Sequence, residues 1–120
     1  MTDAELLARA DAVAERAYAP YSKFLVGCAV LTRDGRVIEG VNVENAAYPL
    51  GVCAERAAFS RAIAEGHRLG DFVVAAVTAS PCGGCRQWLV EMGVERVVFR
   101  HGADVRTMTP SELLPDTFEL

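Results

Sequence analysis

The sequence lacks a long apolar run, and it is poor in lysine and histidine. No stretch reaches the roughly 18 consecutive apolar residues of a membrane helix, and residues 1–20 do not combine a basic start with an apolar block. Lys23 is the only lysine among 12 basic residues, which are scattered and outnumbered by 16 acidic ones. Proteins that bind long nucleic acids usually carry a patch of basic residues, which this scattered distribution does not provide. We therefore expect a mature, soluble, cytoplasmic protein that binds neither nucleic acid nor membrane.

The sequence also has no disulfide-rich pattern, and its four cysteines are Cys28, Cys53, Cys82 and Cys85. Four cysteines are too few for a disulfide scaffold at this length, so reduced thiols or metal binding is the better explanation. A composition of 52% hydrophobic and 23% charged residues excludes a disordered chain. The length of 120 residues fits one domain, spanning 1–120.

The spacing of apolar residues predicts alternating helices and strands. The expected helices cover residues 3–18, 53–65 and 82–92, with a short one beginning at 110. The expected strands cover residues 24–32, 37–41, 72–79, 96–99 and 105–108, and residues 42–52 are expected to form a loop. Because helices and strands alternate, the fold class is α/β: three layers (α/β/α) around a mixed, roughly five-stranded sheet. The strand at 24–32 is apolar on both faces, which indicates an interior position.

Three of the cysteines lie at the starts of two predicted helices. Pro81-Cys82-Gly83-Gly84-Cys85 opens one helix, and Cys53-Ala54-Glu55 opens another. Cysteines at i and i+3 share one side of a first helical turn, where unpaired N–H groups favour thiolates. If the two helix starts converge, three thiolates surround one point and leave a fourth tetrahedral position open, as in catalytic zinc sites. A water in that position has its pKa lowered to about 7.

Two charged residues follow Cys53 on the same predicted turn. Glu55 is close enough to take a proton from a metal-bound water and pass it to a substrate nitrogen. Arg56 can donate to a thiolate sulfur and draw off negative charge. Each residue alone also fits an ordinary helix surface, since acidic side chains are common in first turns. Their joint occurrence with the cysteines is what favours a catalytic role.

Two other interpretations of the cysteines follow from the residues alone. A Cys-x-x-Cys motif at a helix start is also typical of thiol-redox proteins, although Cys53 and Glu55 have no role there. A closed, structural zinc site needs a fourth ligand, and the candidates are Cys28, His67 and His101. The apolar alternation around Cys28 predicts a core residue. Both histidines lie in polar turns, where we expect them to be exposed to solvent.

Taken together, the motifs resemble the zinc-dependent cytidine deaminase superfamily. Its signature matches Cys-Ala-Glu at 53–55, followed after 25 residues by Pro-Cys-x-x-Cys at 81–85. Other segments are similar to the small free-nucleoside cytidine deaminases: Tyr18-Ala19-Pro20-Tyr21-Ser22-Lys23-Phe24 with Val26-Gly27, Asn42-Val43-Glu44-Asn45, and Leu113-Leu114-Pro115 with Phe118. The resemblance covers nearly the whole chain.

The resemblance implies hydrolytic deamination of cytidine and deoxycytidine to uridine and deoxyuridine, with release of ammonia, in pyrimidine salvage. It implies that Cys53, Cys82 and Cys85 bind zinc, that zinc-bound hydroxide attacks carbon 4, and that Glu55 shuttles protons. It also implies a homotetramer with shared active sites. Independent support comes from the 53–65 helix, which is apolar around most of its circumference and so favours subunit contact.

The same resemblance implies a set of substrate contacts. Phe24 packs on the pyrimidine ring, the backbone of Ala54 holds the base edge, and Asn42 and Glu44 bind the ribose hydroxyls; Tyr48 and Phe118 approach from neighbouring subunits. An alternative is a deaminase of a cytosine nucleoside antibiotic such as blasticidin, which keeps the zinc motifs. The intact pair of Asn42 and Glu44 argues against that alternative.

Overall fold

Strands with apolar side chains on both faces form the middle of a five-stranded sheet. The computed structural model describes residues 1–120, and the strands run in the order β2-β1-β3-β4-β5. Their bounds are β1 Gly27–Thr32, β2 Val37–Val41, β3 Phe72–Val77, β4 Arg96–His101 and β5 Asp104–Met108. β3 and β4 are parallel, and the other neighbouring strands are antiparallel. The expected mixed sheet is confirmed, with β1 in an interior position.

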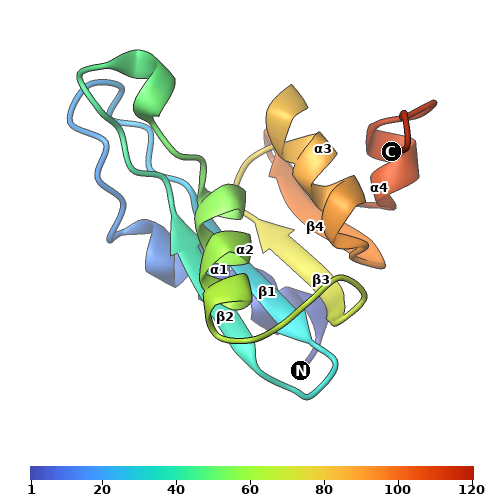
Figure 1. Ribbon diagram of the computed structural model, residues 1–120. Helices are drawn as coiled ribbons and strands as arrows, with labels where there is room; N and C mark the ends of the chain where they lie inside the picture. The colour runs from blue at the N-terminus through green and yellow to red at the C-terminus, as the bar shows by residue number, and fades with distance from the viewer.

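Helices cover both faces of this sheet (Figure 1). Their bounds are α1 Asp3–Ala14, η1 Tyr48–Leu50 (a 3₁₀ turn), α2 Ala54–Ala64, α3 Gly83–Met92 and α4 Pro110–Leu113. α1 packs on one face, and α2 and α3 pack on the other. The three-layer α/β/α architecture is therefore confirmed. None of the helices combines the length and the apolar character needed to span a membrane.

The alternation of side chains along β1 divides the interior into two clusters. Cys28 and Val30 point to the α2 and α3 side, whereas Ala29 points to the α1 side. Successive residues of a strand face opposite sides, so an apolar β1 is buried by helices on both. Cys28 is fully buried, which confirms its predicted place in the core.

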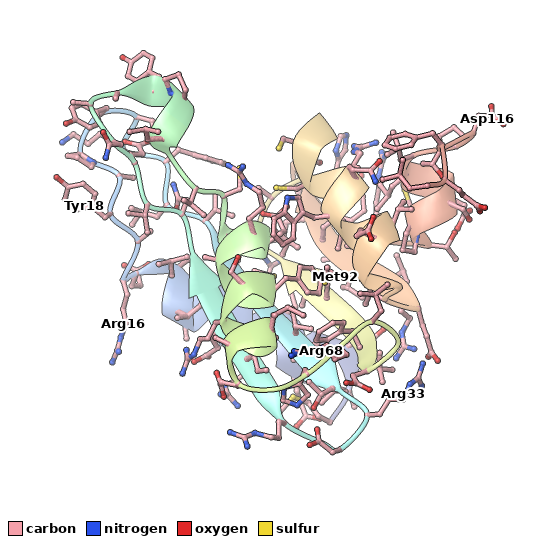
Figure 2. All side chains as sticks on the ribbon, viewed as in Figure 1. Arg16, Tyr18, Arg33, Arg68, Met92 and Asp116 are labelled. Atoms are coloured by element: carbon pink, nitrogen blue, oxygen red, sulfur yellow. The ribbon has the colours of Figure 1, made fainter.

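The first helix and the first strand are shorter than predicted. α1 ends at Ala14 rather than at residue 18, because the backbone of Tyr18 pairs with that of Asn42 and Glu44 instead of continuing the helix. Tyr18 bridges to Val43, and its side chain points away from the sheet (Figure 2). β1 begins at Gly27 rather than at residue 24. The Asn42 side chain forms hydrogen bonds with the backbone of Phe24 and Val26, where a neighbouring strand would otherwise pair.

The remaining boundaries shift by one to two residues. α2 and α3 begin one residue later than predicted, because Cys53 and Cys82 are their N-cap residues with extended backbone. β3 ends at residue 77 instead of 79, β4 continues to 101 instead of 99, and the 42–52 loop contains η1. The prediction for His67 is wrong: it is only 9% exposed, because it packs near Phe72.

Candidate active site

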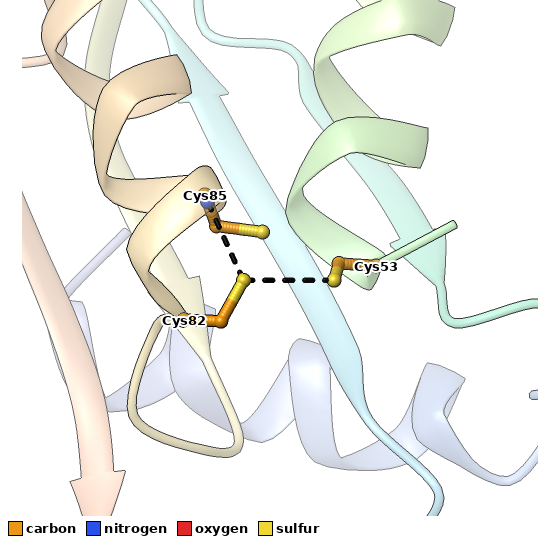
Figure 3. Close-up of side chains that lie close together, drawn as sticks. All are labelled: Cys53, Cys82 and Cys85. Atoms are coloured by element: carbon orange, nitrogen blue, oxygen red, sulfur yellow. Dashed lines mark hydrogen bonds between the residues drawn. The ribbon is translucent and has the colours of Figure 1, made fainter. Parts of the chain in front are cut away.

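The three cysteines at the two helix starts come together. The Sγ atoms of Cys53, Cys82 and Cys85 all lie within 4.8 Å of one another. Figure 3 shows Cys53 at the start of α2 facing Cys82 and Cys85 at the start of α3. The sulfurs of Cys53 and Cys82 are 3.8 Å apart. The Cys85 backbone N–H donates to the Cys82 sulfur at 3.4 Å. The two helix starts therefore converge, as the sequence suggested.

This group of sulfurs fits a zinc ion with one open position. Sulfurs bound at about 2.3 Å to a tetrahedral zinc lie about 3.8 Å apart. The sulfurs of Cys53 and Cys82 have this spacing, and no pair in the group is more than 4.8 Å apart. No histidine, carboxylate or fourth cysteine belongs to the group. Cys28 lies in the core and His101 bonds to Ser80, so neither supplies the fourth ligand of a closed site.

The thiols differ in their acidity. Burial raises the pKa of Cys53 and, more strongly, that of Cys85. Burial also opposes ionisation of Cys82, but hydrogen bonds from the Cys85 backbone and from the other two thiols outweigh it, so the pKa of Cys82 is lowered. Cys53 and Cys85 are thus harder to ionise than an ordinary thiol, and Cys82 is easier to ionise. A divalent cation would displace their protons, as thiolate sites require.

Glu55 is a buried carboxyl in the same pocket. It lies in the first turn of α2 and is only 3% exposed. Burial raises the pKa of Glu55, while its own backbone N–H, the Cys85 thiol and Arg56 oppose that rise. Because it lines the same pocket as Cys53 and Cys82, this carboxyl can exchange protons with a molecule bound beside the sulfurs.

Arg56 places a guanidinium beside the thiol of Cys53. Its Nη2 donates to the Gly51 carbonyl at 3.0 Å and lies 4.0 Å from the Cys53 sulfur. Its Nε is buried without a partner. A fixed positive charge at this position stabilises negative charge on a thiolate.

The pocket in front of the sulfurs has a volume of about 480 Å³. Small-molecule sites commonly fall between about 300 and 1,000 Å³. Residues from 22–26, 42–56 and 77–82 line it, including Phe24 and the predicted ribose contacts. Tyr48 lies at the rim of this chain's own pocket and is 81% exposed. Phe118 is not among the lining residues and lies near the C-terminus, beyond α4.

Asn42 binds the backbone next to Phe24. Its Oδ1 accepts from the Val26 N–H at 2.8 Å, and its Nδ2 donates to the Phe24 carbonyl at 2.9 Å. A side-chain amide carries two N–H donors. One N–H of Asn42 therefore remains for a ligand, while the other holds the segment before β1 that contains Phe24.

Glu44 is held by the loop before β1. Its carboxylate accepts from the backbone N–H groups of Tyr21 and Ser22, at 2.9 and 3.1 Å, and from the Ser22 hydroxyl. That hydroxyl is the main cause of a lowered pKa for Glu44, so the carboxylate is ionised at neutral pH. An ionised carboxylate accepts about four hydrogen bonds, which leaves room for about one more.

Sequence reasoning did not assign individual roles to Ser22 and Ser80. Ser22 fixes Glu44 across 22 positions of the chain, and Ser80 lines the pocket and bonds the Nδ1 of His101 at 2.8 Å. Ser22 lies in a motif segment and Ser80 directly precedes one, and these positions are the one available signal. Their partners are distant in sequence, so the contacts themselves had no local signature.

Comparison with known proteins agrees with this geometry. The family model for the cytidine and deoxycytidylate deaminase zinc-binding region matches residues 1–101. The cytidine deaminase of Halalkalibacterium halodurans is 44% identical, over 94% of this chain and 91% of that protein. The cytidine deaminase of Sporosarcina psychrophila is 42% identical, over 95% and 89%.

A solved structure gives the same result in three dimensions. The crystal structure of cytidine deaminase from Burkholderia pseudomallei has a TM-score of 0.92 and 46% identity to this chain, and the match covers 98% of this chain and 100% of that one. The chain therefore belongs to the cytidine and deoxycytidylate deaminase zinc-binding family.

Proposed function

We propose that this protein is a zinc-dependent cytidine deaminase, in which the whole chain forms one deaminase domain. It hydrolyses cytidine and deoxycytidine to uridine and deoxyuridine and releases ammonia. The observation that supports this most directly is the group of three cysteine sulfurs beside the buried carboxyl of Glu55 in one pocket. Similarity to proteins named cytidine deaminases supports the substrate class.

In this proposal, Cys53, Cys82 and Cys85 bind the zinc. The bound ion supplies a water of lowered pKa, which is a nucleophile at neutral pH. Three thiolates leave an excess of negative charge at the site, and Arg56 beside Cys53 offsets part of it. The two helix starts contribute in the same direction, because their free N–H groups favour negative charge.

Glu55 moves the protons. Its carboxylate takes one proton from the attacking water and delivers it to ring nitrogen 3. It then takes the second proton from the oxygen now bonded to carbon 4 and delivers it to the amine, and the carbon–nitrogen bond breaks to release ammonia. The water oxygen remains on carbon 4, so cytidine and water yield uridine and ammonia. Burial supports this role, because it raises the pKa of Glu55 and lets the carboxyl hold a proton closer to neutral pH.

The other lining residues orient the nucleoside. Phe24 packs on the pyrimidine ring, and the backbone of Ala54 holds the base edge beside the sulfurs. The free N–H of Asn42 and the remaining acceptor position of Glu44 bind the ribose hydroxyls, which are both donors and acceptors. These two residues are two positions apart in extended chain, so their side chains leave it in the same direction.

The ribose contacts predict a change in specificity for Glu44→Gln. Removing the charge weakens acceptance from a ribose hydroxyl, so KM for cytidine is expected to rise about tenfold or more. For a cytosine nucleoside that lacks the ribose hydroxyls, KM is expected to rise far less. The ratio of kcat/KM for cytidine to kcat/KM for that nucleoside therefore falls sharply. Glu39→Gln, on the far strand β2, is the control and should keep both values. An unchanged ratio in Glu44→Gln would count against the ribose role.

The direct test of the proposal is ammonia release. Purified protein mixed with cytidine is expected to release ammonia in step with uridine formation. A zinc chelator is expected to abolish this turnover, and added zinc to restore it. No ammonia from the zinc-loaded protein, or turnover that ignores the chelator, would contradict the proposal.

The proposal extends to the assembly and its setting. Large apolar side chains are exposed at residues that line the pocket or directly adjoin its lining residues, among them Tyr21, Phe24, Tyr48, Leu50 and Val52. Such a patch favours burial against another subunit, which supports a homotetramer with shared sites reached by Tyr48 and Phe118. Zinc-binding thiols must stay reduced, which favours the cytoplasm. Deamination of free nucleosides there fits pyrimidine salvage.

A further inference from the structure

Helix α2 lies directly on the backbone of strand β2 at Gly40. A Cβ atom at Gly40 would lie 2.4 Å from the backbone nitrogen of Ala58 and 2.6 Å from the backbone oxygen of Ala54. Real Cβ atoms essentially never approach other atoms this closely. The contact is made by the first two turns of α2, the end of the helix that Cys53 caps.

We propose that Gly40 is a positioning residue for the metal centre. By carrying no side chain, it lets the start of α2 lie low enough on the sheet to bring Cys53 to Cys82 and Cys85. The inference rests on the proposed role of these three cysteines as zinc ligands.

The three sulfurs come from two separate helices. Cys82 and Cys85 belong to the same turn of α3, so their relative position does not depend on α2. Cys53 depends entirely on where α2 begins. The height of α2 above the sheet therefore sets the distance between the third sulfur and the other two, which is 3.8 Å to Cys82.

The size of the clash decides the outcome. To accommodate a Cβ, the Ala58 nitrogen must retreat by about 1 Å, from 2.4 Å to the 3.4 Å at which ordinary contact begins. Metal–ligand distances in proteins hold to about 0.2 Å. A shift of α2 several times larger than this tolerance cannot leave the site intact.

The strain is relieved at the start of α2 rather than elsewhere. Arg61, near the other end of α2, donates to the Glu39 carbonyl of β2 at 3.3 Å and holds that end down. Strand β2 is paired with β1 from Gly27–Val41 to Leu31–Val37, which opposes its retreat. The start of α2 is therefore the part that moves when a Cβ atom is added at Gly40.

Gly27 provides a matched control on the opposite face. A Cβ there would lie 2.0 Å from the Ala10 oxygen and 2.8 Å from the Ala14 nitrogen of α1. The clash is at least as severe as at Gly40, but α1 contributes no residue to the sulfur group. Gly27→Ala therefore measures the cost of lifting a helix that holds no ligand.

The experiment compares zinc binding in Gly40→Ala and Gly27→Ala, at a temperature where circular dichroism shows both folded. Zinc affinity is measured by competition with a chelator, and cobalt substitution reports the thiolate charge-transfer band. Gly40→Ala is expected to bind zinc about tenfold or more weakly, with a weakened cobalt band, and Gly27→Ala to match the wild type. Equal affinity in Gly40→Ala and the wild type, or equal losses in both variants, would overturn the inference. A wild-type chain that binds no zinc would instead overturn the proposed function on which it rests.

A milder pair of variants covers the case in which the glycine variants do not fold. Ala58→Val and Ala62→Val enlarge fully buried side chains one turn apart on α2. Of these two residues, only Ala58 is among the nearest neighbours of a Cβ at Gly40. At matched losses of thermal stability, Ala58→Val is expected to weaken zinc binding more than Ala62→Val. The reverse order, or no difference, would count against Gly40 as a positioning residue.

Discussion

A Glu55→Gln variant is expected to keep its fold and its zinc and to lose about 10²- to 10⁴-fold in kcat. Glutamine has the shape of the carboxyl and stays neutral, so the buried site can accommodate it without a new charge. It cannot accept a proton from water and return it to nitrogen. The loss should therefore fall on kcat, because the proton transfers occur in the chemical step.

The variant is informative because zinc content and turnover are measured on the same sample. Metal analysis of Glu55→Gln should match the wild type, while the rate of uridine formation collapses. Glu65→Gln is a suitable control, because Glu65 lies at the end of the same helix and pairs with Arg36 and Arg61 on the surface. Turnover by Glu55→Gln within a few-fold of the wild type would rule out the assigned proton transfer.

Local patterns in the sequence were sufficient for most of the fold. Continuous apolar segments predict β1 and β3, because both strands are buried on both faces. Side chains on each face pack against a helix. Helix starts were predicted to within one residue. Two wrong predictions, the start of the first strand and the exposure of His67, both result from long-range contacts. The Asn42 side chain replaces a strand partner before Gly27, and Phe72 helps to bury His67.

The candidate site also combines features that local sequence patterns predict with features that long-range contacts determine. Motifs predict which residues occupy first helical turns, so Cys53, Glu55 and Cys82 could be grouped as candidates. That α2 and α3 start close together on one face of the sheet is a property of the chain's topology. No local pattern encodes the hydrogen bonds from Ser22 to Glu44 or the contact of Gly40 with α2, because each joins residues far apart in sequence.

The cysteines themselves separate zinc chemistry from thiol-redox chemistry. Replacing Cys53, Cys82 or Cys85 by alanine leaves two sulfurs, so zinc content is expected to fall from about one per chain to nearly none, and deaminase activity with it. Cys28→Ala is the matched control, because Cys28 is a buried free cysteine outside the group. It should cost about 1 kcal/mol of stability and leave zinc content unchanged.

Cys53→Ala is the variant on which the two interpretations differ most. A thiol-redox protein would still cycle between a dithiol and a disulfide through Cys82 and Cys85, so Cys53→Ala would keep its function. A zinc enzyme needs the third sulfur, because two thiolates leave a site that binds the ion far more weakly. Metal analysis and ammonia release are measured together on Cys53→Ala and Cys28→Ala. Loss of both zinc and turnover in Cys53→Ala alone is the result that the convergence of α2 and α3 requires, and full activity in that variant would exclude Cys53 as a ligand.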